Sequence, residues 1–335
     1  MAHNFSSGVF LATPAWHRLG VVIRKPISSK EAIKLAGLDW QIIKQPLCRV
    51  NENKANEYKA ISDYSAIVRQ DTDQVFAIRH NSYQVFQNWQ AFEWLNEFIE
   101  SGDLIIDAAI SLSEGRRIAI TCKINTPPAE IVKDDLIECY LVFKNDHTGN
   151  GSLGFIITPV RVVCQNTLSL AVGRDNFEGD VRLDKSNFRF KHIGNLKEKV
   201  AEAKDLIDFQ KRCFNDGMEV YKEMAKYNLP RYKFQEYLEE VFATELKQKQ
   251  KYCLENNLPE PTIWDLQVVK NVIDHYHLTC EEMPAIEGTL YSAVQAVSGA
   301  ITHSKHHQAV QSQLFGRGKS VMEKSLGQAL KLMRV

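Results

Sequence analysis

Basic and aromatic residues alternate in the segment 188–192, which reads Phe-Arg-Phe-Lys-His. In an extended strand this alternation places the cations on one face and most of the rings on the other. Cations neutralise phosphates and aromatic rings stack on bases, at about 1–3 kcal/mol per base, so the pattern is typical of a strand that binds single-stranded nucleic acid. The alternative is a half-buried strand with Phe188 and Phe190 in the core and the cations in water.

The charge around this strand is locally positive, although the whole chain is neutral. The 335 residues include 41 Lys+Arg and 41 Asp+Glu, which excludes a bulk polyanion binder but allows a basic patch. A weaker patch, Phe315–Lys319, has glycines that either let the backbone approach a phosphate or form a plain turn. The predicted nucleic-acid-binding residues are Arg161, Arg182, Lys185, Phe188, Arg189, Phe190 and Lys191.

A second group of polar residues suggests an enzyme acting on nucleotides or nucleic acid. Asp146 and His147 lie in a polar loop, and Arg161 and Cys164 lie at the end of the strand that follows it. A cysteine nucleophile needs a pKa lowered by a base or a helix N-terminus. The alternative for Cys164 is a small thiol in the core. No HExxH, GxSxG, Walker A or paired-carboxylate motif occurs, so the sequence favours a non-catalytic protein.

Two further patterns have simpler explanations. Gly149–Gly154 matches GxGxxG, but β-branched residues and a proline follow it, which predicts a hairpin loop and not a nucleotide-binding turn. His303 with His306 or His307 has helical metal-ligand spacing, yet no acidic residue or cysteine completes a site and Lys305 adds a positive charge. We therefore expect no metal and no cofactor.

Composition places the chain among globular proteins. It is 44% hydrophobic and 24% charged, which excludes wholesale disorder. No apolar stretch approaches the ~20 residues that cross a bilayer, and the first twenty residues lack the features of a signal peptide. Seven cysteines without a CxxC pair are typical of reduced thiols. The sequence thus predicts a cytoplasmic protein with no membrane partner.

Residues 1–190 predict an α+β domain built on an antiparallel sheet. Turn residues separate runs that alternate or are rich in β-branched side chains. A helix at Ser29–Gly37 has a Ser cap and a Gly stop, and a second helix begins at an Asn88 cap and places Phe92, Leu95, Phe98 and Ile99 on one face. The predicted strand regions are 41–50, 58–86, 104–112, 117–124, 136–144 and 153–164.

Residues 191–335 predict a mainly helical second domain. Apolar residues recur there at helical spacing, and prolines mark the loops. At roughly 150 residues per domain, two domains also fit the length. The predicted helices cover 196–214, 231–250, 264–275, 289–303 and 319–333.

The stretch TPVRVVCQNTLSLA at residues 158–171 resembles a phage/plasmid-like family known as domain of unknown function 932. Other stretches also match the family. In chain order they are PAWHRLG, AGLDW, YQVFQNWQAFEWL and SLSEGRRIAI before this stretch, and GTLYSAVQAV and SQLFGRGKSVMEKSLGQAL after it. The resemblance implies an origin in a mobile element but no mechanism. At the level of fold, the nearest analogy is to single-strand annealing proteins, in which an antiparallel sheet is crossed by a helix and rings or filaments hold DNA in a basic groove.

We therefore expect a non-catalytic DNA-metabolism protein of a phage or plasmid that binds single-stranded DNA and promotes annealing. It would form a homo-oligomer through the strand edges of its first domain. One alternative is a protein-binding factor, such as a host-defence inhibitor or a replication accessory, that presents its helical domain to the partner. The enzyme described above is the other. Salt dependence separates them, because neutralising Z phosphates of a single strand gives a slope near −0.7Z.

Overall fold

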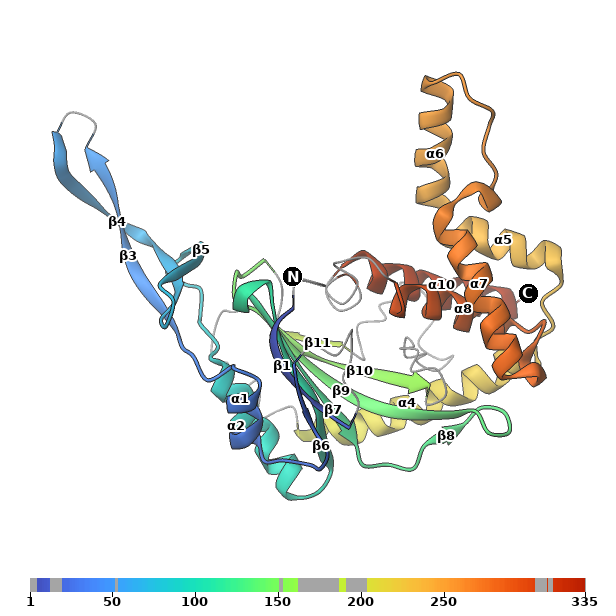
Figure 1. The fold of residues 1–335 in the computed structure, drawn as a ribbon, viewed down its shortest axis with the longest axis horizontal. Coiled ribbons are helices and arrows are strands. Elements are labelled where there is room, and N and C mark those ends of the chain that lie inside the picture. The colour runs from blue at the N-terminus through green and yellow to red at the C-terminus, as the bar shows by residue number, and fades with distance from the viewer. Residues whose placement is uncertain are drawn as a thin grey trace. The chain divides into compact units, whose positions relative to one another are not determined.

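The computed structural model describes residues 5–12, 20–51, 54–150, 153–161, 187–190, 204–304, 312 and 316–334. They form an α+β protein, as the sequence predicts (Figure 1). Two compact units combine separate stretches of chain. Unit 1 comprises Met1–Thr126, Tyr140–Ile157 and Asn187–Phe209, and unit 2 comprises Pro127–Cys139, Thr158–Ser186 and Gln210–Val335. The boundary predicted near residue 190 lies beside residues outside the described part and stays a prediction.

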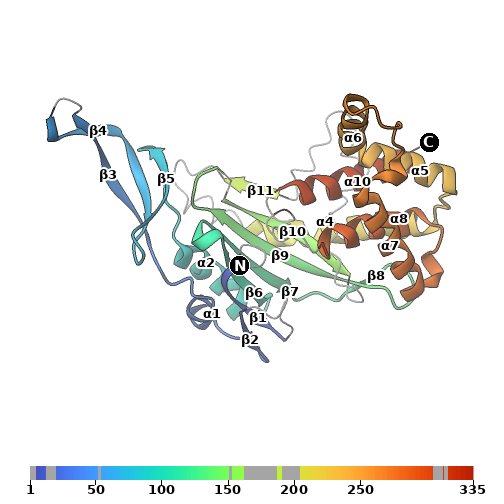
Figure 2. The same cartoon turned by 45° about the horizontal axis from the view of Figure 1, so that its top comes forward.

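The larger sheet has the strand order β11-β10-β9-β7-β6-β1-β2, with β8 beside β9 (Figure 2). Neighbours pair antiparallel from β9 through β7 and β6 to β1, and β10 pairs antiparallel with β11. β1 and β2 pair in parallel. The strands are β1 (Phe5–Leu11), β2 (Val21–Ile23), β6 (Leu104–Leu112), β7 (Arg117–Ile124), β8 (Ala129–Glu130), β9 (Leu136–Asp146), β10 (Leu153–Arg161) and β11 (Asn187–Phe190).

The hairpins of this sheet form where turn residues predict them. β6 and β7 are joined by a single helical turn, η2 (Ser113–Gly115), and β9 and β10 flank the GxGxxG loop. All three residues of η2 have positive φ, between 52° and 96°. A side chain at Gly115 would lie 3.0 Å from Trp40 and from Arg69, so the close packing there requires glycine.

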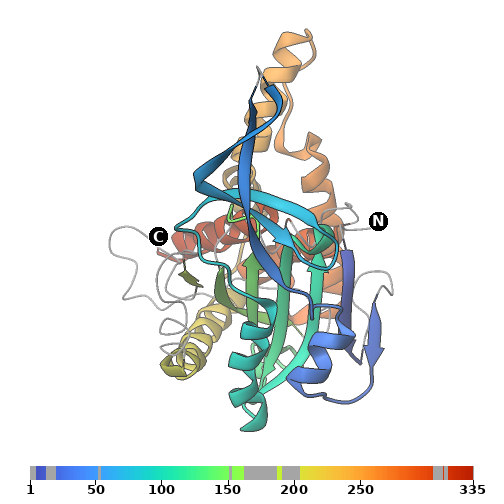
Figure 3. The ribbon, with the colours of Figure 1, turned by 90° about the vertical axis from the view of Figure 1, so that its left-hand side faces the viewer.

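Two helices pack next to β6, α1 (Ser29–Leu35) and α2 (Asn88–Glu100) (Figure 3). Ser28 and Glu31 form a capping box at the start of α1, as the predicted Ser cap requires. Leu95 of α2 is completely buried, and Phe92 and Phe98 are buried beside it. The predicted apolar face of α2 is therefore the face that enters the core.

The predicted Asn88 cap is wrong. The cap position is Gln87, whose backbone N–H donates to Oε1 of Gln90 at 2.8 Å. Asn88 is the first residue of the helix and is buried, because its amide group bonds to other parts of the chain. Its Nδ2 donates to the carbonyl oxygen of Leu38 at 3.1 Å.

A second, three-stranded sheet has the order β3-β4-β5, from β3 (Ile42–Asn51), β4 (Lys54–Arg69) and β5 (Gln74–His80). β3 is an edge strand of this sheet, as Pro46 predicts. β5 pairs with β4 only between Tyr64 and Arg69. Residues 47–51 and 54–61 therefore form a two-stranded ribbon that extends away from β5 (Figure 1), and we call this ribbon the arm.

Unit 2 is mainly helical. Its central helix is α8, in which every residue from Leu290 to Ala300 is buried, as expected for a helix that is apolar on all sides. α7 and α10 pack against it. The helices are α4 (Lys204–Lys226), α5 (Arg231–Val241), α6 (Ala243–Glu255), η5 (Ile263–Asp265), α7 (Gln267–Glu282), η6 (Pro284–Ile286), α8 (Leu290–Thr302) and α10 (Arg317–Met333). No helix in the described part of the chain is long and apolar enough to cross a membrane.

Leu95→Ala should lower the free energy of unfolding by about 2–5 kcal/mol, because it removes a fully buried side chain and leaves a cavity. The matched control is Leu35→Ala on the neighbouring helix α1, where the leucine is 41% exposed and the loss should be smaller. Urea denaturation of both variants measures the difference. Equal losses would contradict the placement of α2 against the sheet.

Candidate functional site

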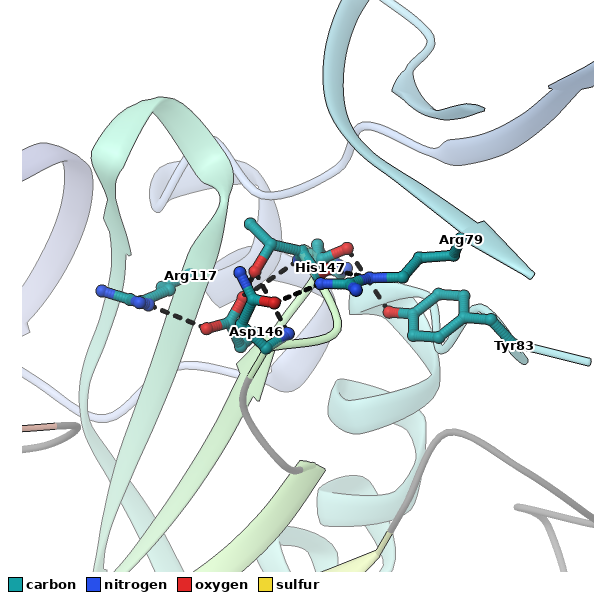
Figure 4. A network of polar contacts seen from close by, with 7 residues as sticks. Arg79, Tyr83, Arg117, Asp146 and His147 are labelled. Atoms are coloured by element: carbon teal, nitrogen blue, oxygen red, sulfur yellow. Dashed lines mark hydrogen bonds and ion pairs between the residues drawn. The ribbon is translucent and has the colours of Figure 1, made fainter. Parts of the chain in front are cut away.

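Polar side chains are buried where β9 ends. Lys144, Asn145, Asp146, His147 and Thr148 are each no more than 9% exposed. A buried polar group costs free energy unless a hydrogen bond compensates it. Figure 4 shows how the contacts around Asp146 and His147 join this loop to β5 and β7.

Both ring nitrogens of His147 lie within hydrogen-bond distance of asparagine side chains. Its Nε2–H donates to Oδ1 of Asn88 at 2.9 Å, and its Nδ1 accepts from Nδ2 of Asn145 at 3.4 Å. The rings of Trp40 and Phe76 lie against it, with centroids 5.4 and 6.3 Å away. The side chain is 1% exposed and both ring nitrogens are engaged. This environment fits a structural histidine and not a general base.

Asp146 organises the loop that follows it. Its Oδ2 accepts from Nε of Arg117 at 2.9 Å. Its Oδ1 accepts from the backbone N–H of Thr148 at 2.9 Å and from the Thr148 hydroxyl at 2.5 Å. Both carboxylate oxygens are therefore used within the protein, which compensates the burial of the charge.

Arg79 connects β5 to the same loop. Its Nε–H donates to the carbonyl oxygen of Thr148 at 2.6 Å, and its guanidinium also donates to the side chain of Asn150. Gly149 lies beneath the guanidinium with φ +69°, and a Cβ there would be 2.8 Å from Arg79 Nε and 2.9 Å from the Tyr83 ring. The loop can pass under Arg79 only because residue 149 has no side chain.

Tyr83 completes these contacts. Its hydroxyl donates to the carbonyl oxygen of His147 at 3.4 Å. Burial raises the pKa of Tyr83 far above its ordinary value, and the charge of Asp146 acts in the same direction. The phenol therefore stays neutral and keeps its proton for this bond.

A second set of contacts connects the three-stranded sheet to η2. The Arg69 guanidinium lies 4.5 Å from the centroid of the Trp40 ring and donates to the carbonyl oxygen of Glu114 at 3.2 Å. Gln74 and Arg116 donate to the Glu114 carboxylate at 2.5 and 3.0 Å. These two hydrogen bonds lower the pKa of Glu114, with that from Gln74 the larger cause. Arg69, Gln74 and Arg79 thus fix the inner end of the three-stranded sheet.

The arm itself is solvated on both faces. Val50, Tyr58 and Ile61 are 55%, 67% and 38% exposed, and none of the described arm side chains is buried. Arg49 pairs directly with Lys59 across the two strands, which places two exposed cations on one face of the ribbon. Val50 pairs with Tyr58 on the other face.

The arm and the buried loop differ in which side chains they expose. The arm offers cations and an aromatic ring to solvent, whereas Asp146 and His147 are buried and bonded within the protein. In the described part of the chain, no group of three or more His, Cys, Asp or Glu side chains could hold a metal ion. The loop therefore positions the inner end of the three-stranded sheet, and the arm is its solvent-exposed outer part.

The predicted nucleic-acid-binding residues fall largely outside the described side chains. Phe188, Arg189 and Phe190 form the predicted strand, β11, at one edge of the larger sheet, and Gly154 of β10 pairs with Arg189. Arg161 is the last residue of β10. Arg182, Lys185 and Lys191 lie outside the described residues, as do Cys164 and the histidines at 306 and 307.

The described residues of the enzyme hypothesis, Asp146, His147 and Arg161, are not brought together, and Cys164 lies outside the described residues. Asp146 and His147 precede β10, whereas Arg161 ends it, and the nine-residue strand from Leu153 to Arg161 spans roughly 26 Å. Arg161 thus lies at the far end of the hairpin from His147.

Sequence reasoning missed Arg79 and the Arg49–Lys59 pair. Arg79 is one of several polar residues that alternate with apolar ones along β5. Nothing in the sequence therefore indicates that it bonds to Thr148, 69 residues further along. The Arg49–Lys59 pair requires the register of β3 and β4, and a shift of one residue would separate the cations.

The family model described as Domain of unknown function (DUF932) matches residues 75–322. The chain belongs to this family. No curated protein and no solved structure matches it. The DUF932 match begins inside β5 and includes Arg79 and the Asp146–Asn150 loop, whereas the arm precedes it. The comparison thus confirms the predicted family and supplies no activity.

Gly149→Ala should destabilise the protein more than Gly102→Ala. Both glycines have positive φ, +69° and +81°, so each alanine incurs a backbone penalty of about 1–2 kcal/mol. Only at Gly149 would the new methyl group also meet Arg79 and Tyr83, while nothing lies within 4 Å of Gly102. Thermal or urea unfolding measures the difference. Equal effects would show that Arg79 does not pack on the loop.

Proposed function

We propose that this protein is a non-catalytic binder of single-stranded DNA and that the arm is one of its contact surfaces. The observation that carries the proposal is the Arg49–Lys59 pair on a ribbon exposed on both faces. Two like charges directly opposite each other destabilise a strand pair. A phosphate bound between them would remove that repulsion, and the free ribbon therefore favours an anionic ligand.

An aromatic side chain next to Lys59 in the sequence favours a nucleotide strand over other anionic ligands. Tyr58 is the residue before Lys59 and projects from the opposite face, largely into solvent. An unpaired base can stack on such a ring, whereas a paired base inside a duplex has no exposed face to offer. A single strand that bends around the narrow ribbon can place a phosphate at Arg49 and a base on Tyr58.

The charge of the arm is modest. Residues 47–61 contain three cations, Arg49, Lys54 and Lys59, and two acidic residues, Glu52 and Glu57. A local excess of one positive charge fits few phosphate contacts per copy. Strand β11, with its Phe-Arg-Phe sequence at the edge of the larger sheet, is the second surface that we propose for DNA.

The proposal also includes the mobile-element origin that the family resemblance implies and the annealing activity that the fold-level analogy to single-strand annealing proteins suggests. A protein partner is the runner-up, because Val50 and Ile61 expose apolar surface on the same arm. The salt series below separates the two, since apolar docking has little dependence on salt.

Arg49→Gln/Lys59→Gln should reduce the salt dependence of binding to a labelled single-stranded oligonucleotide. Losing two phosphate contacts lowers the magnitude of the slope of log K against log salt concentration by about 1.4. Fluorescence anisotropy across a salt series measures it. The matched control is Lys30→Gln/Lys34→Gln on α1, which removes two exposed cations elsewhere and should leave the slope unchanged.

Three results would count against the arm or the function. An unchanged slope in the arm variant removes the arm, and loss of binding in Arg189→Glu/Lys191→Glu alone then assigns the DNA to β11. An equal preference for duplex DNA contradicts the single-strand proposal. No binding at low salt rejects the function, and a protein retained by the chain after nuclease treatment would favour the runner-up.

Tyr58→Ser should weaken binding to single-stranded DNA while leaving the salt slope as it is in the unaltered protein. Losing one stacked base costs about 1–3 kcal/mol, which is a 5- to 150-fold increase in Kd. Tyr58→Phe retains the ring and should bind as the unaltered protein does. Equal loss in both variants would show that the hydroxyl matters and not the stacking.

A further inference from the structure

Helix α2 presents an acidic stripe to solvent. Trp89, Glu93, Glu97 and Glu100 are exposed and recur at the i, i+4, i+8 and i+11 positions, which places them on one side of the helix, opposite Leu95. Trp89 is 44% exposed, which is a large apolar surface at one end of the stripe. We call this surface the α2 stripe.

Helix α6 of unit 2 presents a basic stripe to solvent. Lys247, Lys251 and Leu254 are exposed and lie on one side of the helix, away from the buried Cys253. Leu254 is 80% exposed and lies at the C-terminal end. We call this surface the α6 stripe.

The spacing of the two stripes matches in antiparallel orientation. From Trp89, the α-carbons of Glu93 and Glu97 lie about 6 and 12 Å along the helix axis. From Leu254, those of Lys251 and Lys247 lie about 4.5 and 10.5 Å along the axis in the other direction. Opposing the two helices therefore brings Trp89 to Leu254, one glutamate to Lys251 and the next to Lys247.

We propose that the α2 stripe of one copy binds the α6 stripe of a second copy. The occupant is a second copy because one chain carries both surfaces and each provides the charge and the apolar residue that the other lacks. This contact differs from the strand-edge assembly that the sequence predicts and does not depend on the proposed DNA binding.

Such a contact is head-to-tail. The surface used on one copy is different from the surface used on the next, so every added copy offers a new α2 stripe or a new α6 stripe. The assembly is a ring where the rotation closes and a filament where it does not.

Within its own helix, Lys251 forms only a weak ion pair. Its Nζ lies 3.8 Å from Oε1 of Glu255, one turn further on, and both side chains are more than half exposed. Exposed pairs of this kind contribute little, so Lys251 can exchange this partner for a glutamate of another copy.

The test is an exchange of charges between the stripes. Lys247→Glu/Lys251→Glu and Glu93→Lys/Glu97→Lys should each weaken self-association at least about tenfold, because like charges then oppose. The variant with all four changes should associate again, as should a mixture of the two double variants. Mass photometry and sedimentation velocity at low salt measure the masses.

The control for altered charge is Lys324→Glu/Lys331→Glu on α10, which reverses two exposed lysines outside both stripes and should leave the mass unchanged. Circular dichroism checks that every variant is folded. The inference fails if the unaltered chain is monomeric, if the double variants keep its mass, or if the fourfold variant does not recover it.

Discussion

The arm depends on the contacts at its inner end. A two-stranded ribbon is marginally stable in water by itself, and residues 47–61 bury none of their described side chains. Its order must therefore come from the inner sheet, where Ala66, Ile67 and Val68 are buried and where Arg69 and Arg79 bond to η2 and to the Asp146–Asn150 loop. The bond from Arg79 to the Thr148 carbonyl joins β5 to the loop of the larger sheet and so links the two sheets.

Burying the polar side chains of this loop costs desolvation free energy, which apolar side chains would not incur. Replacing a buried ion pair with well-packed apolar side chains is often neutral or stabilising, so Asp146 and Arg117 are a poor source of stability. Directional bonds accept only one arrangement of their partners, as those of Asn88 and Asn145 to His147 show. One bond is missing, since Oδ1 of Asn145 is buried without a hydrogen-bond partner in the described structure. The network therefore favours a defined position of the arm over maximal stability.

Local signals predicted most of the fold, and long-range pairing explains what they missed. The Ser28 cap, the Ser113–Gly115 turn and the apolar face around Leu95 are each written within a few residues, so the helices and hairpins could be predicted. β1 was missed because its place between β6 and β2 depends on partners about 100 residues away and on a few residues of weak alternation. The sequence around Asn88 predicts a helix cap because the contact that Asn88 makes instead, with His147, involves a residue 59 positions further along the chain. The candidate site is the least predictable part. The pairing of Arg49 with Lys59 depends on the register of β3 and β4, and the contact of Arg79 depends on a loop 69 residues away.

Few phosphate contacts per copy and a head-to-tail contact have a joint consequence. Under the proposed function, a single arm with two opposed cations would bind a nucleotide strand weakly, because few phosphate contacts give little affinity and little electrostatic steering. Where several copies are linked, each further arm meets the same strand at a high effective concentration, and affinity grows without any new kind of contact. The geometry of the assembly then decides the length of strand that is held. A neutral chain can bind a polyanion when its charges are segregated onto separate surfaces, and the two proposals together assign Glu93 and Glu97 to a neighbouring copy and Arg49 and Lys59 to the strand.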